Sequence, residues 1–230
     1  MTPTEQFLDS VEKGIIPDYP PQFDEDTFNS SFLSVTAKAR SFCTKRGMWA
    51  IVDKQWTKEL AKWIDDRKCL EIMAGVGWLS KALSNHGIDI IATDDFSWTT
   101  KGKRHENMFP VHPIEKLDAI NAIKKYKERD ILLVSWPPYT DETIVKCCDE
   151  WGYDKPIIYI GEGEGGCCAT KSFWLRFKEA DNVPRIELPK WGGIHDYIFV
   201  GYWGKVDNVC ADCSYDARED IQAAQVMYTE

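Results

Sequence analysis

The sequence predicts an α/β fold with a doubly wound, mostly parallel sheet of seven strands, preceded by N-terminal helices. Short apolar runs alternate with segments of helical spacing between residues 69 and 203. Two runs, at 130–135 (DILLVS) and 156–160 (PIIYI), are continuously apolar, as are strands that a parallel sheet buries on both faces. A glycine-rich turn at 73–77 joins the first apolar run to a helical segment. A chain of 230 residues suits one large domain of this class.

Residues 1–46 are expected to form an N-terminal extension of helical and irregular structure. Three prolines between positions 17 and 21 interrupt any long helix there. Capping residues followed by spaced apolar residues predict a helix over 26–44. Asp53 is expected to cap another helix, which leads into the first strand at Cys69.

Residues 47–206 are expected to form the α/β domain, and residues 207–230 an acidic tail. The expected strands lie at 69–72, 88–92, 109–112, 130–135, 156–160, 183–188 and 197–203, the last one antiparallel. The expected helices of this domain lie at 78–84, 118–126, 140–151 and 172–180.

The turn after the first strand, MAGVG, is the first candidate binding element. Gly75 and Gly77 allow a tight turn and close approach of the backbone to a ligand, and the following helix start offers free N–H groups. The second apolar run ends at Asp94 and Asp95, and Asp94 is expected to bind the two hydroxyls of a ribose. The segment predicts an adenosine-containing cofactor. The alternative is an ordinary crossover without a ligand.

The residues around this turn distinguish between cofactors. A dinucleotide fingerprint requires a third glycine where this chain has Ser80. Trp78 occupies the helix start where a pyrophosphate would lie, and Glu71 would repel a diphosphate but attract a cation. S-adenosylmethionine carries a sulfonium and an ammonium and has no phosphate, so it is favoured over NAD. A nucleotide-dependent oxidoreductase remains a weaker alternative.

Other candidate residues follow the later strands, because ligands of open α/β sheets bind beyond the carboxyl ends of the strands. The fourth run ends in SWPPY and the fifth in GEGEGG. We expect Ser135 and Trp136 to line the donor methyl, and Tyr139 and Glu162 to line the substrate. His195 or Glu162 would serve as a base where the acceptor must lose a proton. A rigid turn, a solvated loop and a structural histidine are the alternatives for these segments.

Together these segments resemble class I S-adenosylmethionine-dependent methyltransferases. The glycine turn is similar to motif I, E/D-x-G-x-G-x-G, with Met73 in place of the first glycine, and the fourth strand end is similar to N/D/S-P-P-Y/F, with Trp136 at the polar position. The chain further resembles a largely uncharacterised methyltransferase-like group that shares W-A-I, W-P-P-Y, G-E-G-x-G-G and W-x-G-I-H-D segments over about residues 47–203. The resemblance implies a Rossmann-like methyltransferase fold and names no substrate.

The sequence therefore predicts an S-adenosylmethionine-dependent methyltransferase whose acceptor is a small molecule or a protein side chain. The alternative is a cofactor- or partner-binding module of this fold without turnover. The predicted cofactor-binding residues are Glu71, Ala74, Gly75, Gly77, Asp94, Asp95, Asp118 (with Glu115 as its substitute at the adenine) and Ser135. The predicted catalytic residues are Trp136, Tyr139, Glu162 and His195.

Composition restricts partners and location. A net charge of −9 argues against sequence-independent binding of nucleic acid. Eight cysteines without an apolar leader, and no apolar run long enough to cross a bilayer, favour free thiols in the cytoplasm. Cys210 and Cys213 have the spacing of half a zinc site, but no second half is visible, so no metal is expected. The oligomeric state is left open.

Overall fold

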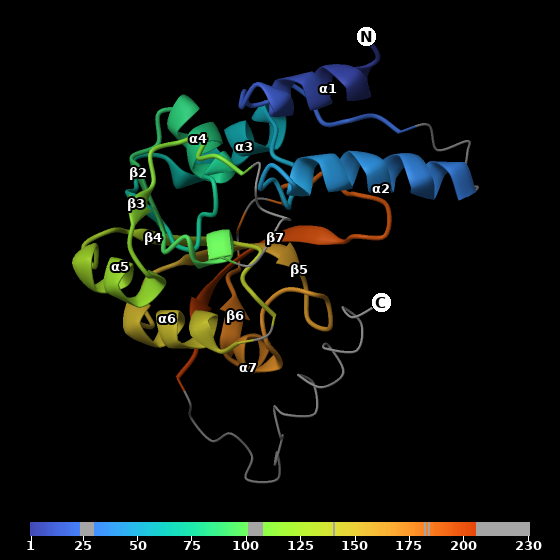
Figure 1. The fold of residues 1–230 in the computed structure, drawn as a ribbon. Helices are drawn as coiled ribbons and strands as arrows, with labels where there is room; N and C mark the ends of the chain where they lie inside the picture. The colour runs from blue at the N-terminus through green and yellow to red at the C-terminus, as the bar shows by residue number, and fades with distance from the viewer. Residues whose placement is uncertain (24–29, 101–107, 140, 182, 184, 206–230) are drawn as a thin grey trace.

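The computed structural model describes residues 1–23, 30–100, 108–139, 141–181, 183 and 185–205 (Figure 1). The expected acidic tail, the Cys210–Cys213 spacing and the first residues of the helix expected at 26–44 lie outside this part of the chain.

The described residues form a seven-stranded sheet in the order β3-β2-β1-β4-β5-β7-β6. The strands are β1 (Cys69–Glu71), β2 (Ile90–Asp94), β3 (Glu115–Lys116), β4 (Ile131–Ser135), β5 (Ile157–Glu162), β6 (Phe177–Glu179) and β7 (Asp196–Trp203). The pairs from β3 to β5 are parallel, whereas β7 is antiparallel to both β5 and β6. The predicted α/β fold is thus confirmed, with a mixed sheet that is antiparallel at one edge.

Helices cover both faces of this sheet (Figure 1). They are α1 (Pro3–Glu12), α2 (Ser30–Thr44), α3 (Lys54–Ile64), α4 (Trp78–Asn85), α5 (Ala119–Lys125), α6 (Thr143–Trp151) and α7 (Lys171–Arg176). Side chains of α1 to α4 pack in one apolar cluster, and those of α5 to α7 pack in a second. No helix of the described residues is long and apolar enough to cross a membrane.

The central strand β4 shows why the sheet is doubly wound. Its first four residues are fully buried, with Ile131 and Leu133 in one cluster and Leu132 and Val134 in the other. Successive side chains of a strand point to opposite faces, so an uninterrupted apolar run requires cover on both sides. The run DILLVS therefore dictates two helical layers.

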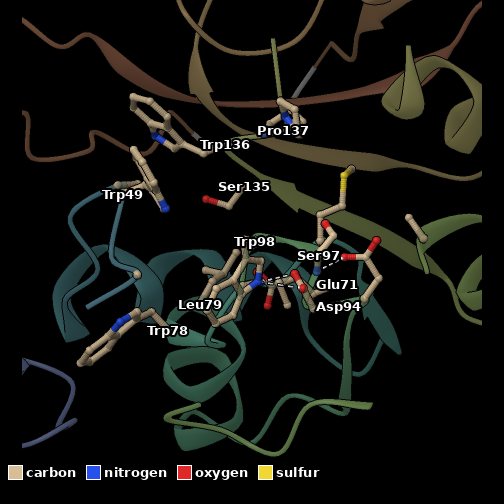
Figure 2. Close-up of a pocket in the computed structure, with 18 of the residues that line it drawn as sticks. Trp49, Glu71, Trp78, Leu79, Asp94, Ser97, Trp98, Ser135, Trp136 and Pro137 are labelled. Carbon is tan, nitrogen blue, oxygen red and sulfur yellow. Dashed lines mark hydrogen bonds between the residues drawn. The ribbon is translucent and has the colours of Figure 1, made fainter. Parts of the chain in front are cut away.

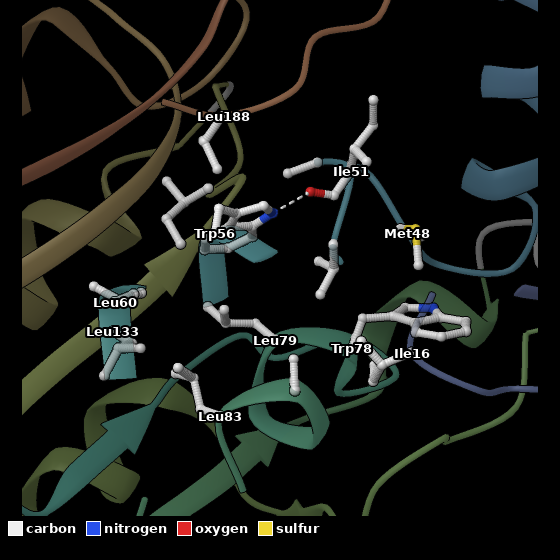
Figure 3. Close-up of a cluster of buried hydrophobic side chains, with 14 of the residues drawn as sticks. Ile16, Met48, Ile51, Trp56, Leu60, Trp78, Leu79, Leu83, Leu133 and Leu188 are labelled. Atoms are coloured by element: carbon white, nitrogen blue, oxygen red, sulfur yellow. Dashed lines mark hydrogen bonds between the residues drawn. The ribbon is translucent and has the colours of Figure 1, made fainter. Parts of the chain in front are cut away.

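The segment before β1 is held by local capping and by the core. Asp53 accepts hydrogen bonds from the N–H groups of Gln55 (2.7 Å) and Trp56 (3.3 Å), which confirms it as the N-cap of α3. The buried indole of Trp56 donates to the Ile51 carbonyl at 3.0 Å (Figure 3). Phe7 of α1 and Cys43 of α2 belong to the same cluster, so these two helices share a core with the sheet.

Three expected elements are wrong. The third strand is Glu115–Lys116 and not 109–112: it is a two-residue edge strand whose polar residues give no apolar signal. The helix expected at 172–180 ends at Arg176, because 177–179 pair with β7 as strand β6. That strand takes the edge position expected for 183–188, where the described positions form no strand.

Candidate functional site

A cavity of about 720 Å³ lies at the carboxyl ends of β1, β2 and β4 (Figure 2). Its wall includes the predicted residues Glu71, Ala74, Gly75, Asp94, Asp95, Asp118, Ser135 and Trp136. It also includes residues that the sequence did not single out, among them Arg40, Met48, Trp98, Met108, Asp141 and Cys167. The structure therefore brings most of the predicted cofactor residues to one place.

Asp94 ties the end of β2 to the glycine turn. Its Oδ2 accepts the N–H of Gly75 at 2.7 Å, and its Oδ1 accepts the N–H of Phe96 at 2.7 Å and the indole N–H of Trp98 at 3.0 Å (Figure 2). Burial raises the pKa of this carboxyl, although these donors oppose the shift. A carboxylate offers about four lone-pair positions, so Asp94 keeps little capacity for a ligand.

The two glycines of the turn have different roles. Gly75 has φ +59° and lines the cavity, and a Cβ added there would meet nothing within 4 Å. Gly77 has φ +85° and starts α4, and a Cβ there would lie 2.9 Å from the Cβ of His112. Gly75 therefore offers bare backbone to a ligand. Gly77 is absent from the cavity wall and instead allows close packing against the segment before β3.

Glu71 is buried beside the turn and held by Ser80. Its carboxylate accepts the N–H of Ser80 at 3.1 Å and also the Ser80 hydroxyl. Burial raises the pKa of Glu71 to about 7, so its charge changes near neutral pH. Ser80, which breaks the dinucleotide fingerprint, is the residue that satisfies this acid.

The remaining predicted cofactor residues differ in exposure. Asp95 is exposed and accepts the N–H of Ser97 at 2.7 Å. Asp118 is exposed and caps α5, accepting the N–H of Asn121 at 3.0 Å and its side-chain amide at 2.6 Å, and these bonds lower its pKa. Glu115 does not line the cavity and pairs with Lys125 at 2.6 Å.

Trp136 forms part of the wall at the opposite end of the cavity from Asp94 and Trp98, with Ser135 between the two ends (Figure 2). Its indole N–H donates to Asp196 Oδ1 at 3.0 Å, and its ring stacks on Trp49 with centroids 5.7 Å apart. Burial raises the pKa of Asp196 to about 7. Asp196 therefore fixes the orientation of Trp136, a role that the sequence pattern W-x-G-I-H-D did not reveal.

The turns that follow β1, β2 and β4 share a backbone feature. Met73, Phe96 and Trp136 have φ values of 52°, 58° and 53°. Residues with side chains rarely adopt this left-handed conformation, and it costs about 1–3 kcal/mol. Met73, at the position of the first motif glycine, thus keeps a glycine-like backbone.

Three predicted catalytic residues, Tyr139, Glu162 and His195, are not on the cavity wall. Glu162 Oε2 accepts the N–H and the thiol of Cys167 at 2.9 and 2.8 Å, and its Oε1 accepts the N–H of His195 at 3.1 Å. Burial favours the neutral acid, but the hydrogen bonds of Cys167 and His195 outweigh it and lower the pKa of Glu162. Glu162 thus holds together the loop after β5 and the start of β7, and only Cys167 of this group reaches the cavity.

The residues missed in the sequence differ in the signal they gave. Trp98 follows Asp94 by four residues, and Trp49 lies in the W-A-I segment, so both were near known features. Arg40 lies within α2, far in sequence from any strand end, and gave no signal. Cys167 directly follows the glycine-rich loop.

The wall is strongly acidic. It carries Glu71, Asp94, Asp95, Asp118 and Asp141, against Arg40 as the only Lys or Arg among its described residues. Bare backbone at Gly75 beside these acids fits a cofactor that carries positive charge and no phosphate. Within the described residues, no group of three or more His, Cys, Asp or Glu side chains is placed to hold a metal ion.

No protein-family model matches this sequence, and no curated protein matches it. Among solved structures, the chain is similar to 1,6-didemethyltoxoflavin-N1-methyltransferase from Burkholderia thailandensis, with bound S-adenosylhomocysteine (14% identity, 76% of this chain and 87% of that chain, TM-score 0.43). It is also similar to magnesium protoporphyrin IX methyltransferase from Synechocystis PCC 6803, with bound SAM (12%, 72% and 83%, TM-score 0.41). A third is a SAM-dependent methyltransferase from Archaeoglobus fulgidus (16%, 66% and 95%, TM-score 0.37). At such values a function for this chain must come from its own residues.

Proposed function

We propose that this protein is an S-adenosylmethionine-dependent methyltransferase of class I fold whose acceptor is a small molecule or a protein side chain. One observation carries the proposal: Asp94 holds the N–H of Gly75 at 2.7 Å beside bare backbone, on a cavity lined by five acids. That wall suits the ammonium and sulfonium of S-adenosylmethionine and disfavours a diphosphate.

Each cofactor residue then has a role that follows from its contacts. The backbone at Ala74 and Gly75 would lie against the methionine part, and Glu71, whose pKa burial raises to about 7, would contribute negative charge above that pH. Asp94 would orient the turn, and Asp95, which is exposed at the cavity and accepts from Ser97, would accept from the ribose hydroxyls. Asp118 would face the adenine amino group.

The chemistry needs positioning more than acid or base. The bound cofactor supplies an electrophilic methyl group, and transfer is an in-line displacement. The chain contributes by aligning the acceptor and excluding water, with Ser135 and Trp136 beside the methyl. Where the acceptor must lose a proton, Asp141 is one carboxylate of the wall that would take it, and Glu162 would act through Cys167, whose thiol donates to it. Tyr139 and His195 are not on the wall.

A second candidate is a cofactor- or partner-binding module without turnover. Of the four predicted catalytic residues only Trp136 lines the cavity, and its indole N–H is already used by Asp196. Trp136 would then shape the cavity without offering its N–H to an acceptor.

The proposed setting is the cytoplasm. The six cysteines in the described part of the chain are free thiols, which a reducing compartment preserves. The net charge of −9 and the acidic cavity make a small molecule or a protein side chain a better acceptor than nucleic acid.

Calorimetric titration with S-adenosylmethionine, S-adenosylhomocysteine and NAD tests the cofactor. We expect both adenosyl amino acids to bind and NAD to show no heat. Label transfer from radioactive S-adenosylmethionine to small-molecule and protein fractions of an extract then tests turnover. Binding without transfer to either fraction would favour the module, and absence of binding would reject both candidates.

A further inference from the structure

Arg40 lies on the cavity wall and forms no ion pair with any acid of the described residues. Its guanidinium carbon lies 5.6 Å from the centre of the Trp136 ring. Its Nε is buried and has no hydrogen-bond acceptor. A buried donor of a charged group costs free energy when it is left unpaired, so this N–H requires an acceptor that the described part of the chain does not provide.

Asp196 does not neutralise Arg40 by direct contact. It is 1% exposed, its Oδ1 accepts from Trp136, and its buried Oδ2 has no partner. Arg40 is close enough to lower the pKa of Asp196, yet no ion pair joins Arg40 to any acid in the part of the chain that the structure describes. Arg40 thus lies over the Trp136 ring while Asp196 accepts from the indole N–H, so the guanidinium has no carboxylate partner among the described residues.

The cavity is polarised along its length. Asp94 and Trp98 lie at one end and Trp49 and Trp136 at the other (Figure 2). Arg40, the only Lys or Arg of the described wall, is over Trp136 at the second end. A ligand that fits this wall carries its positive charge beside the acids and a negative group beside Arg40.

We infer that Arg40 and Trp136 form a carboxylate-binding subsite. A guanidinium presents N–H groups in a fork that matches a carboxylate, and the Trp136 face stabilises the cation through its π-system. The inference rests on the proposed function for the source of the carboxylate. Two molecules of that reaction can supply it: the methionine end of the cofactor, or an acidic acceptor with a planar body that packs beside the two indoles.

Two pairs of ligands separate these sources. S-adenosylhomocysteine and 5′-methylthioadenosine share the adenosine and thioether, but only the first has the amino-acid carboxylate. Benzoate and its neutral analogue benzamide probe the acceptor end. Binding would be measured by calorimetry and tryptophan fluorescence on the full chain, for the wild type, Arg40→Gln and Arg40→Lys.

Arg46→Gln is the matched control. Arg46 follows α2, lies 3.6 Å over the ring of Phe42 and pairs with Glu12, but it is not on the cavity wall. The Arg46→Gln variant therefore loses an arginine that stacks on an aromatic ring but keeps Arg40 and the subsite. Thermal unfolding of each variant checks that it folds.

We expect Arg40→Gln to lower the affinity for one carboxylate ligand about 10- to 100-fold, as for a lost charged hydrogen bond. The neutral member of that pair should be unaffected, and Arg46→Gln should change neither. A loss for S-adenosylhomocysteine assigns the subsite to the cofactor, and a loss for benzoate assigns it to the acceptor. Arg40→Lys, which keeps the charge without the fork, should lose about tenfold and serves if the glutamine variant does not fold.

The subsite would be overturned if wild type, Arg40→Gln and Arg46→Gln all bind S-adenosylhomocysteine with the same affinity and also all bind benzoate with the same affinity. It would also be overturned by a wild type that does not prefer the carboxylate in either pair. If the wild type binds both adenosine ligands and Arg40→Gln changes nothing, only the subsite fails. If it binds neither adenosine ligand yet prefers benzoate through Arg40, the subsite stands and the proposed function fails.

Discussion

The N–H of Gly75 and the Oδ2 of Asp94 are 2.7 Å apart, and this hydrogen bond joins the turn after β1 to the end of β2. Asp94 is 5% exposed and also accepts from Phe96 and Trp98. One side chain thus fixes two of the three strand ends that form the cavity. Loss of this carboxylate should affect stability and cofactor binding together.

Asp94→Ala leaves three donors without their acceptor. We expect a loss of about 1–3 kcal/mol in the free energy of unfolding, together with at least tenfold weaker binding of S-adenosylhomocysteine. Urea denaturation and calorimetry measure the two effects. Asp95→Asn is the control: this exposed side chain should change stability by less than about 0.5 kcal/mol. If Asp94→Ala is as stable as wild type, the turn does not depend on the hydrogen bond between Gly75 and Asp94.

The two glycines of the turn should respond differently to alanine. Gly77→Ala combines positive φ with a Cβ 2.9 Å from that of His112, so we expect mainly destabilisation, of about 2 kcal/mol or more. Gly75→Ala carries the same positive-φ strain but has open space around its Cβ on the cavity wall, so it should cost less stability than Gly77→Ala and weaken cofactor binding more. Thermal unfolding measures the stability of both variants, and calorimetry measures their affinity for the cofactor. The reverse ranking would mean that Gly77 faces the ligand.

Removal of the indole N–H of Trp136 should leave Asp196 without its hydrogen-bond donor. Trp136→Phe keeps an aromatic ring, so we expect a loss of about 1–3 kcal/mol at pH 8, where Asp196 is ionised. The loss should be smaller at pH 5.5, because burial raises the pKa of Asp196 to about 7 and the carboxyl is then protonated. Trp49→Phe, which keeps the stacked pair and leaves Asp196 satisfied, is the control. A loss that does not vary with pH would contradict this role for Asp196.

Glu71 should make stability depend on pH in the direction opposite to most acids. Burial raises its pKa from 4.5 to about 7, so the folded state keeps a proton that the unfolded state has released. Its contribution to stability is complete below pH 4.5, declines as the pH rises to about 7 and is constant above. The free energy of unfolding of Glu71→Gln, minus that of wild type, should therefore rise by about 2 kcal/mol from pH 5 to pH 8.

Glu162→Gln is the matched control for this pH series. Hydrogen bonds lower the pKa of Glu162, so its stabilising charge is present throughout this range and is lost only at lower pH. The difference from wild type should be flat between pH 5 and pH 8. Denaturant titrations at four pH values test both variants, and a flat difference for Glu71→Gln would argue that its carboxyl is ionised in the folded protein.

Much of the fold followed from the sequence because its central strands are apolar on both faces. The strands expected at 130–135 and 156–160 match β4 and β5 closely, and Asp53 caps α3 as expected. The edges could not be predicted in the same way. β3 consists of Glu115 and Lys116, and β6 was expected to be the end of a helix, because pairing with β7 and not local propensity sets its conformation.

In the candidate site too, residues at strand ends could be predicted and residues from other elements could not. Eight of the twelve predicted site residues line the cavity, since the carboxyl ends of neighbouring parallel strands meet at one edge of the sheet. Arg40 arrives from a helix distant in sequence, and Asp196 acts behind Trp136, so neither follows from strand ends. Glu162 and His195 do lie together, but through a hydrogen bond that supports the loop.

The left-handed backbone of Met73 bears on how such a site is identified. At φ +52° this residue reproduces the path that a glycine would take, and its side chain packs against the cluster of α5 to α7. The conformation of the turn thus depends on its dihedral angles and on the hydrogen bond from Gly75 to Asp94. The side chain at position 73 can therefore pack in the core. A search by backbone angles and hydrogen-bond geometry would find turns of this kind where a search by glycine spacing passes over them.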